Sequence, residues 1–325
     1  MTGEGHPRTA LGVDIGGTNL AFVLLDTTGK VVARHLAPTN RAETPEMVVG
    51  GFTRHLEAGL HADTATLSAV GVGVAAQVRK GTGEVIFAPN LGWRDVPLRH
   101  LVEQGLRHPC VVVNDVQAAT YAELTAGEGQ GQEDIAVLRL GTGVGGGVVL
   151  SGKLLEGSSG TAGEFGHLTI VSGGRRCPCG GAGCLEAYVS GSAIGQRARE
   201  AFADEPSKGA GLKAAAGGTD HIDARSVGRA YRFRDPLAVE LVQETAAYLA
   251  AGIVSVVNGL NPSVVVLAGG VIDGIPDLAS LAEARVRELA LPAATGHLKV
   301  VRSSLGEYAG AVGAAALALA KHATL

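Results

Sequence analysis

The chain has 325 residues, of which 46% are hydrophobic and 18% charged, and its 27 basic and 31 acidic side chains give a formal net charge of -4. This mild acidity argues against a strongly basic nucleic-acid-binding surface. Glycine is unusually frequent: the 49 glycines are about 15% of the chain, roughly twice the ordinary usage. They show no three-residue period, which excludes collagen. The composition predicts a globular protein of about two domains.

The sequence shows neither a targeting signal nor a membrane span. Residues 1–10 are polar and lack the apolar core of a signal peptide. The most continuous apolar stretch, residues 310–320, is too short to cross a bilayer and predicts a packed terminal helix. We therefore expect a cytoplasmic protein that binds neither membrane nor nucleic acid.

The hydrophobic pattern predicts alternating strands and helices, which is typical of an α/β protein. Helix starts are marked by Thr44-Pro45 and Asp235-Pro236, where a capping side chain precedes a proline. Residues 203–220, rich in glycine, alanine, lysine and proline, predict a mobile connection. The expected strands cover residues 11–14, 20–25, 30–36, 69–74, 111–113, 135–140, 147–150 and 264–267. The expected helices cover residues 45–58, 115–125 and 236–258, followed by the terminal helix.

Two glycine-rich turns, at residues 14–18 and 141–146, each join two expected strands. Glycine lets a backbone approach an anion closely and turn its N–H groups toward it. The second turn also fits G-x-G-x-x-G, but a dinucleotide-binding turn opens a helix, and residues 147–150 predict a strand. There is no P-loop sequence either. On the residues alone, each turn fits a phosphate-binding loop or a tight hairpin without a ligand.

Asp115 is expected where a buried strand ends and a helix begins, which is where ligands gather in α/β sheets. Its carboxylate fits two roles. It is suited to accept a proton from a substrate hydroxyl, or it is an ordinary helix N-cap.

A cluster of one histidine and three cysteines matches a structural zinc site, which is tetrahedral and closed. The proline and glycines between these cysteines suit a tightly folded knuckle. In a chain without an export signal, such crowding favours metal over disulfides. The expected ligands are His167, Cys177, Cys179 and Cys184. Three thiolates fill most of the coordination shell, so zinc-dependent hydrolysis is not expected, and the isolated Cys110 is expected to be a buried apolar residue.

Taken together, these motifs resemble the ROK family, which groups bacterial sugar kinases with sugar-responsive repressors. The resemblance covers nearly the whole chain and is most specific in the cysteine segment. It rests on residues 14–18, Asn114-Asp115, 141–147, 163–167 and 177–186. The family implies the actin-like ATPase (ribonuclease H-like) fold, an α/β fold of two lobes with a cleft between them. We expect a small domain of residues 1–115, completed by 305–325, and a large domain of residues 116–304 that carries the zinc knuckle.

The resemblance implies an ATP-dependent hexose kinase similar to bacterial glucokinases, with ATP, Mg²⁺ and structural Zn²⁺ as cofactors. Asp115 would be the base that accepts the proton of the sugar 6-hydroxyl. The residues implied to bind the sugar are Asn90, Asn114, Asp115, Glu164, His167 and Glu186. Those implied to bind the phosphates, magnesium or adenosine are Asp14, Gly16, Gly17, Thr18, Thr142, Gly143, Gly269 and Gly270. The family also suggests a homodimer or tetramer.

Ala76 departs from the family pattern, because many members carry glycine at this sugar-contacting turn. Kinases for fructose, N-acetylglucosamine or N-acetylmannosamine therefore stay open as alternatives to glucose. A repressor would need a helix-turn-helix module before residue 11, and only about ten residues precede it. A binding protein with a dead site is disfavoured by the presence of Asp115.

Overall fold

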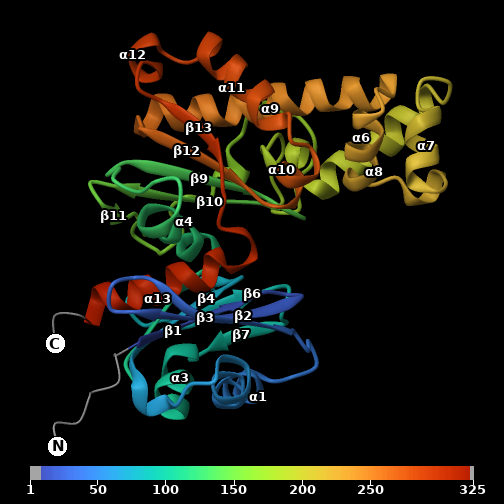
Figure 1. The fold of residues 1–325 in the computed structure, drawn as a ribbon. Helices are drawn as coiled ribbons and strands as arrows, with labels where there is room; N and C mark the ends of the chain where they lie inside the picture. The colour runs from blue at the N-terminus through green and yellow to red at the C-terminus, as the bar shows by residue number, and fades with distance from the viewer. Residues whose placement is uncertain (1–8, 323–325) are drawn as a thin grey trace, which may run out of the picture. The chain divides into compact units, whose positions relative to one another are not determined.

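The computed structural model describes residues 9–322. The chain divides into two compact units, each built from strands and helices (Figure 1). The first unit comprises residues up to 131 together with 151–163 and the C-terminal segment from 304, and the second comprises residues 132–150 and 164–303. Two α/β units are what the sequence predicts, but the first is larger than the expected domain.

The first unit is built on a five-stranded sheet with the order β3-β2-β1-β4-β8. The neighbours β1, β2 and β3 are antiparallel, whereas β4 and β8 run parallel to β1. A small antiparallel sheet of β5, β6 and β7 follows β4, and the sequence reasoning missed it. The strands are β1 (Thr9–Ile15), β2 (Asn19–Asp26), β3 (Val31–Pro38), β4 (Leu67–Val74), β5 (Gln77–Val78), β6 (Val85–Ala88), β7 (Trp93–Val96) and β8 (Cys110–Asn114), with β11 (Lys153–Leu154) in the 151–163 segment.

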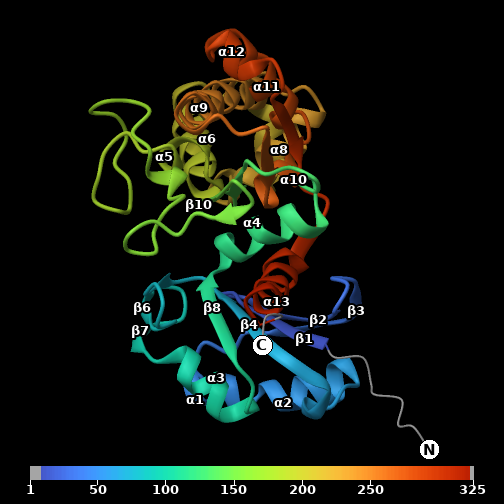
Figure 2. The same ribbon diagram turned by 90° about the vertical axis from the view of Figure 1, so that its left-hand side faces the viewer.

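Helices cover both faces of this sheet: α13 and α4 lie on one face, and α1 and α3 lie on the other (Figures 1 and 2). The expected helix at 45–58 is divided near Gly50 and Gly51, two residues with poor helix propensity. The helices are α1 (Pro45–Gly50), α2 (Phe52–Arg54), a π-helix (His55–Gly59), a 3₁₀ turn (Thr64–Thr66), α3 (Leu98–Leu106), α4 (Asp115–Ala126), a 3₁₀ turn (Gly306–Tyr308) and α13 (Ala309–His322).

Glycines let α13 lie directly on the sheet and on α4. A Cβ on Gly71 of β4 would collide with the α13 backbone at Ala314, and a Cβ on Gly313 would collide with the Ala118 carbonyl of α4. This close packing explains why α4 and α13 both belong to the first unit, and hence why the unit extends beyond residue 115. Part of the glycine excess is thus a packing requirement.

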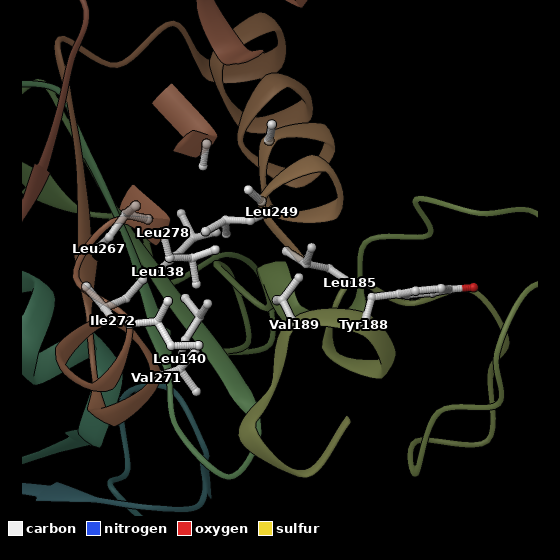
Figure 3. Packing of buried hydrophobic residues seen from close by; sticks show 14 of the residues in the cluster. Leu138, Leu140, Leu185, Tyr188, Val189, Leu249, Leu267, Val271, Ile272 and Leu278 are labelled. Carbon is white, nitrogen blue, oxygen red and sulfur yellow. The ribbon is translucent and has the colours of Figure 1, made fainter. Parts of the chain in front are cut away.

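The four strands of the second unit follow the order β10-β9-β12-β13, which corresponds to β2-β1-β4-β8 of the first unit. Strand β10 is antiparallel to β9, and β12 and β13 run parallel to β9. Apolar side chains of β9 and β12 meet those of α5, α9, α10 and α11 in one core (Figure 3). The strands are β9 (Ile135–Leu140), β10 (Val144–Leu150), β12 (Val264–Ala268) and β13 (Lys299–Arg302).

The helices of the second unit are α5 (Glu186–Val189), α6 (Gly191–Asp204), α7 (Ala210–Ala216), α8 (Ala224–Arg232), α9 (Pro236–Leu260), α10 (Gly270–Gly274), α11 (Leu278–Leu289) and α12 (Pro292–Thr295), with 3₁₀ turns at Phe165–His167 and Thr219–His221. Helix α9 is the one described helix long and apolar enough to cross a membrane, but one face of it is buried in this core.

The expectation of a mobile connection at 203–220 is wrong, because helix α7 forms there. Leu212 is fully buried, and its N–H donates to the Asp235 carboxylate at 3.1 Å. The polar and small residues of this segment do not indicate that Leu212 packs into the core with residues of α8 and α9.

Candidate active site and metal centre

The turn between β1 and β2 has its carbonyl groups held by residues that follow β3. Thr39 Oγ1 donates to the Gly16 carbonyl at 2.7 Å, and the Thr39 N–H donates to the Thr18 carbonyl at 2.8 Å. Arg41 Nε donates to the Gly17 carbonyl at 2.7 Å. The N–H groups of Gly17 and Thr18 have no hydrogen-bond partner among residues 9–322. Such amides can receive an anion.

Neither Thr39 nor Arg41 is expected at this turn from the sequence. They reach the turn only because β3 pairs in register with β2, so that Pro38 lies opposite Asn19. A residue more than 20 positions away gives no local signal of such a contact.

Asp14 and Asp115 come together around Gly73. Strand β4 lies between β1 and β8, and its Gly73 pairs with Asp14 on one side and Val113 on the other. A Cβ on Gly73 would lie 3.6 Å from both Asp14 Oδ1 and the Asp115 Cα. The ends of three parallel strands therefore bring two carboxylates, far apart in sequence, to one edge of the sheet.

The N-cap of α4 is Asn114 and not Asp115. Asn114 Oδ1 accepts hydrogen bonds from the N–H groups of Val116 at 2.8 Å and Gln117 at 3.2 Å. Its Nδ2 donates to the Ala76 carbonyl at 3.1 Å. The alternative in which Asp115 serves as the cap is thus wrong, and the carboxylate stands in the first turn of the helix.

Asn90 joins this group from the turn after β6. A Cβ on Gly17 would lie 3.1 Å from the Asn90 Cβ, so the exposed Asn90 side chain stands beside the glycine turn. The first unit therefore gathers Asp14, Gly16, Gly17, Thr18, Asn90, Asn114 and Asp115. The other expected site residues lie in the second unit.

The four expected metal ligands lie together in the second unit. Their ligand atoms are all within 4.8 Å of one another. The Cys177 Sγ–His167 Nδ1 distance is 3.8 Å, and the Cys179 Sγ–Cys184 Sγ distance is 3.7 Å. In a tetrahedral site with zinc–sulfur bonds of about 2.3 Å, neighbouring ligand atoms are about 3.8 Å apart. The cluster fits a zinc ion, and the short separation at Nδ1 leaves the other histidine nitrogen for another partner.

The two kinds of thiol in this cluster have different environments. Burial raises the pKa of the Cys177 thiol to about 12. Cys179 is exposed, and a hydrogen bond from the Gly181 backbone N–H lowers the pKa of its thiol. A cation bound among the three sulfurs would favour the thiolate at every position.

Glu186 links the metal cluster to the second glycine turn. Its Oε2 accepts the Val144 N–H at 2.8 Å, and its Oε1 lies 3.8 Å from Cys177 Sγ. Gly143 is required there, because a Cβ at that position would lie 2.5 Å from Glu186 Oε2. The Val144 amide is thus occupied by a carboxylate. Any phosphate contact in this turn is left to Thr142 and Gly143.

Leu185 and Gly166 fix this region to the core. Leu185 is fully buried, and its Cδ2 would lie 2.5 Å from a Cβ on Gly252 of α9. Gly166 lies against the Val144 carbonyl, and the His167 N–H donates to the Glu164 carbonyl at 3.0 Å. Glu164 and His167 are therefore held on one turn, and both are exposed.

The two remaining expected residues, Gly269 and Gly270, lie at the end of β12, next to the end of β9. Gly269 has a φ of +95°, and a Cβ there would lie 2.5 Å from the Leu140 carbonyl oxygen. The Gly191 N–H donates to the Gly141 carbonyl at 2.8 Å on the same edge. The second unit therefore brings Thr142, Gly143, Gly269 and Gly270 to one sheet edge, next to Glu186.

Comparisons with known proteins find relatives over nearly the whole chain. The model of the ROK family matches residues 10–321. The glucokinase of Streptomyces coelicolor is 36% identical over 310 residues, covering 95% of this chain and 96% of that protein. The N-acetylmannosamine kinase of Escherichia coli is 32% identical, covering 95% and 98%. A ROK family glucokinase from Streptomyces griseus, solved with glucose and AMPPNP, is 35% identical with a TM-score of 0.79, covering 95% of this chain and 99% of that one. The chain belongs to the ROK family.

Proposed function

We propose that this protein transfers the γ-phosphoryl group of ATP to the 6-hydroxyl of a hexose, with glucose as the substrate. The observation that carries the proposal is that Asp115 and Asp14 meet around Gly73, with helix capping left to Asn114. The glycine turn whose Gly17 and Thr18 N–H groups have no described partner directly follows the strand that carries Asp14. Support comes from the kinship with the S. coelicolor glucokinase and with the S. griseus glucokinase solved with glucose and AMPPNP.

In this proposal the Asp115 carboxylate accepts the proton of the sugar 6-hydroxyl while that oxygen attacks the γ-phosphorus. The bond from the γ-phosphorus to the bridging oxygen breaks, ADP leaves, and the products are ADP, the hexose 6-phosphate and a proton. The turn at 16–18 holds phosphate oxygens through its amides. Phosphoryl transfer needs mainly such positioning and charge stabilisation.

Magnesium and adenosine contacts complete the nucleotide site. Asp14 would hold Mg²⁺, which offsets phosphate charge when it is bound with ATP. Thr142 and Gly143 would contact phosphate oxygens. Gly269 and Gly270 would lie against the adenosine, because the positive φ of Gly269 leaves that edge without a side chain.

The sugar would be bound by Asn90, Asn114, Glu164, His167 and Glu186. Asn114 is the most restricted of these, since its Oδ1 caps α4 and its Nδ2 already makes one bond. One Nδ2 proton remains for a hydroxyl. His167 would bind zinc through Nδ1 and the sugar through Nε2, so the metal would fix the tautomer of a sugar-binding ring.

A zinc ion held by His167, Cys177, Cys179 and Cys184 would then be structural. Its support is the tetrahedral spacing of the ligand atoms. Three thiol ligands also suit a reducing compartment. We accordingly propose a cytoplasmic enzyme, and from the family a homodimer or tetramer, which light scattering on the purified protein would test.

N-acetylmannosamine is the second candidate substrate. The E. coli N-acetylmannosamine kinase is 32% identical to this chain. Ala76 lies at the turn that the family uses for the sugar, and its carbonyl accepts from the candidate ligand Asn114. A methyl group at this turn changes the space around one hydroxyl.

The test is a coupled assay with ATP, Mg²⁺ and a panel of glucose, fructose, N-acetylglucosamine and N-acetylmannosamine. We expect the highest kcat/KM with glucose and a 6-phosphate product. A higher kcat/KM with N-acetylmannosamine would identify that sugar, and not glucose, as the substrate. If no sugar of the panel is phosphorylated, the proposed kinase activity is refuted.

A further inference from the structure

A pocket of about 260 Å³ lies in the first unit, along the free edge of strand β8. We call it the β8-edge pocket. None of the residues assigned above to the sugar, ATP or zinc sites lines it. Its volume is below the range of about 300–1,000 Å³ that is typical of sites for drug-sized ligands. A volume of this size suits a small metabolite. Its lining comprises Val78–Gly81, Gly83, Arg99, Cys110–Val113, Gln117, Glu156, Gly160, Lys321 and His322.

Among residues 9–322, four cations line this pocket together with one carboxylate, that of Glu156. Arg79 and Arg99 are paired with Glu84 and Glu103, each at 2.7–2.8 Å. Lys80 Nζ lies 3.9 Å from Glu156 Oε2. Lys321 forms no ion pair with any described residue. The described lining therefore carries one positive charge, that of Lys321, without a compensating carboxylate, and such a charge favours anions.

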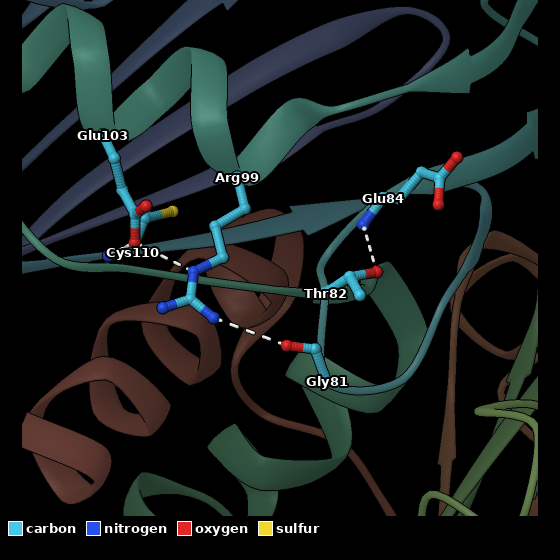
Figure 4. Close-up of polar contacts among 6 residues, drawn as sticks. All are labelled: Gly81, Thr82, Glu84, Arg99, Glu103 and Cys110. Atoms are coloured by element: carbon cyan, nitrogen blue, oxygen red, sulfur yellow. Dashed lines mark hydrogen bonds and ion pairs between the residues drawn. The ribbon is translucent and has the colours of Figure 1, made fainter.

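The Arg99 guanidinium has N–H groups that donate to no described residue. Its Nε donates to Glu103 at 2.8 Å, and its Nη1 lies 3.4 Å from the Gly81 carbonyl (Figure 4). Nη2 has no partner among residues 9–322. A guanidinium has five N–H donors in a planar fork that matches phosphate oxygens. The ion pair with Glu103 fixes the fork at the pocket.

Two further donors lie in the lining. Strand β8 is an edge strand, and the Val70 N–H bonds to the Pro109 carbonyl. Backbone groups alternate along a strand, so residues of β8 at even distances from Pro109 turn their N–H and carbonyl groups toward β4. Val112 lies three positions from Pro109, and its N–H therefore points to the free edge. Both ring nitrogens of His322 are buried and lack partners in the described part of the chain. Buried polar groups are normally paired with protein, water or ligand.

We propose that the β8-edge pocket binds a small phosphorylated metabolite, whose phosphoryl group is held by Arg99, Lys321 and the Val112 N–H. The site is separate from the residues assigned to catalysis, yet connected to them. Strand β8 continues directly into Asn114 and Asp115, and Gln117 of the lining lies in the first turn of α4. A ligand there touches the strand and helix that position the candidate base.

The test is isothermal titration calorimetry on the full-length, zinc-loaded protein, with glucose, AMPPNP and Mg²⁺ at saturation so that the catalytic site is filled. The probes are inorganic phosphate, glycerol 3-phosphate and phosphoenolpyruvate. We expect one site per chain for at least one phosphorylated probe. Lys321→Gln should weaken it at least tenfold, because it removes the lining cation that has no ion pair with a described residue. The matched control is Lys299→Gln, an exposed lysine of β13 in the second unit.

Three results would overturn the proposal. The first is no saturable binding of any probe. The second is equal affinity in the Lys321→Gln and Lys299→Gln variants. The third is binding of inorganic phosphate with exclusion of both esters. None of these readouts depends on turnover, so they are independent of the proposed kinase activity.

Discussion

Of the neighbouring residues Asn114 and Asp115, the first caps helix α4 and the second is the proposed base. The amide oxygen of Asn114 accepts hydrogen bonds from N–H groups in the first turn of α4. The Asp115 carboxylate is therefore not needed as the N-cap. The sequence alone could not separate these roles, because asparagine and aspartate are both good caps. Only the backbone of residue 114, which is extended, identifies it as the cap.

Replacing Asn114 with alanine should therefore lower stability. We expect the free energy of unfolding to fall by about 0.5–2 kcal/mol, with a further loss from the broken bond to the Ala76 carbonyl. Urea denaturation monitored by circular dichroism measures this. Asn114→Asp keeps the accepting oxygen and should retain most of the stability. An unchanged midpoint for Asn114→Ala would contradict the assignment of the cap.

The four cysteines should react in a fixed order with a thiol reagent such as DTNB. Burial raises the pKa of the Cys110 thiol, so this residue should stay inert until the protein unfolds. In the zinc-loaded protein we expect no fast thiol. After chelation Cys179, the exposed member of the cluster, should react first, and Cys179→Ser should abolish that fast phase. A fast phase of equal size before and after chelation would show that no metal protects the cluster.

At the scale of elements, the sequence predicts the strands better than the helices. Strands β1, β4, β9 and β12 are continuous apolar runs, and each lies where the pattern places it. Helix α7 was missed because its anchoring depends on one buried leucine and on Asp235, which lies beyond it in the chain. The small β5-β6-β7 sheet has strands of only two to four residues, too short to show an alternating pattern.

Leu185 is the packing contact that holds the cysteine segment to α9. Truncation to alanine should cost about 2–5 kcal/mol, the range for buried leucine, and should reduce zinc retention because Cys184 and Glu186 flank it. Thermal unfolding and metal analysis measure the two effects. Leu185→Met conserves volume and should cost less than about 1.5 kcal/mol. Full zinc retention in Leu185→Ala would mean that the ligands are positioned without this contact.

At the scale of the whole molecule, the chain forms two units with corresponding strand orders, and the expected site residues are distributed over both. The repeated strand–glycine turn–strand pattern was visible in the sequence. The family resemblance also implies that α13 completes the first unit. It did not imply the same of α4, whose membership depends on the close contact between Gly313 and the Ala118 carbonyl. The same contacts explain part of the glycine excess that the composition shows.

Zinc removal should affect only one of these units. All four ligands lie in the second unit, and structural zinc contributes folding energy directly. After chelation we expect faster amide hydrogen exchange across residues 164–189 and unchanged exchange across residues 9–126, measured by mass spectrometry. Equal acceleration in both units would contradict a local structural role.

We propose Asp115 as the base of ATP-dependent glucose phosphorylation, and kcat for glucose phosphorylation by the Asp115→Asn variant tests this role. Loss of a general base typically costs about 10²–10⁴-fold, and we expect a fall of that size with an unchanged circular dichroism spectrum and unfolding temperature. Asp204→Asn, an exposed aspartate at the end of α6, should leave kcat unchanged. A kcat for Asp115→Asn close to that of the unmodified protein would show that Asp115 is not the base.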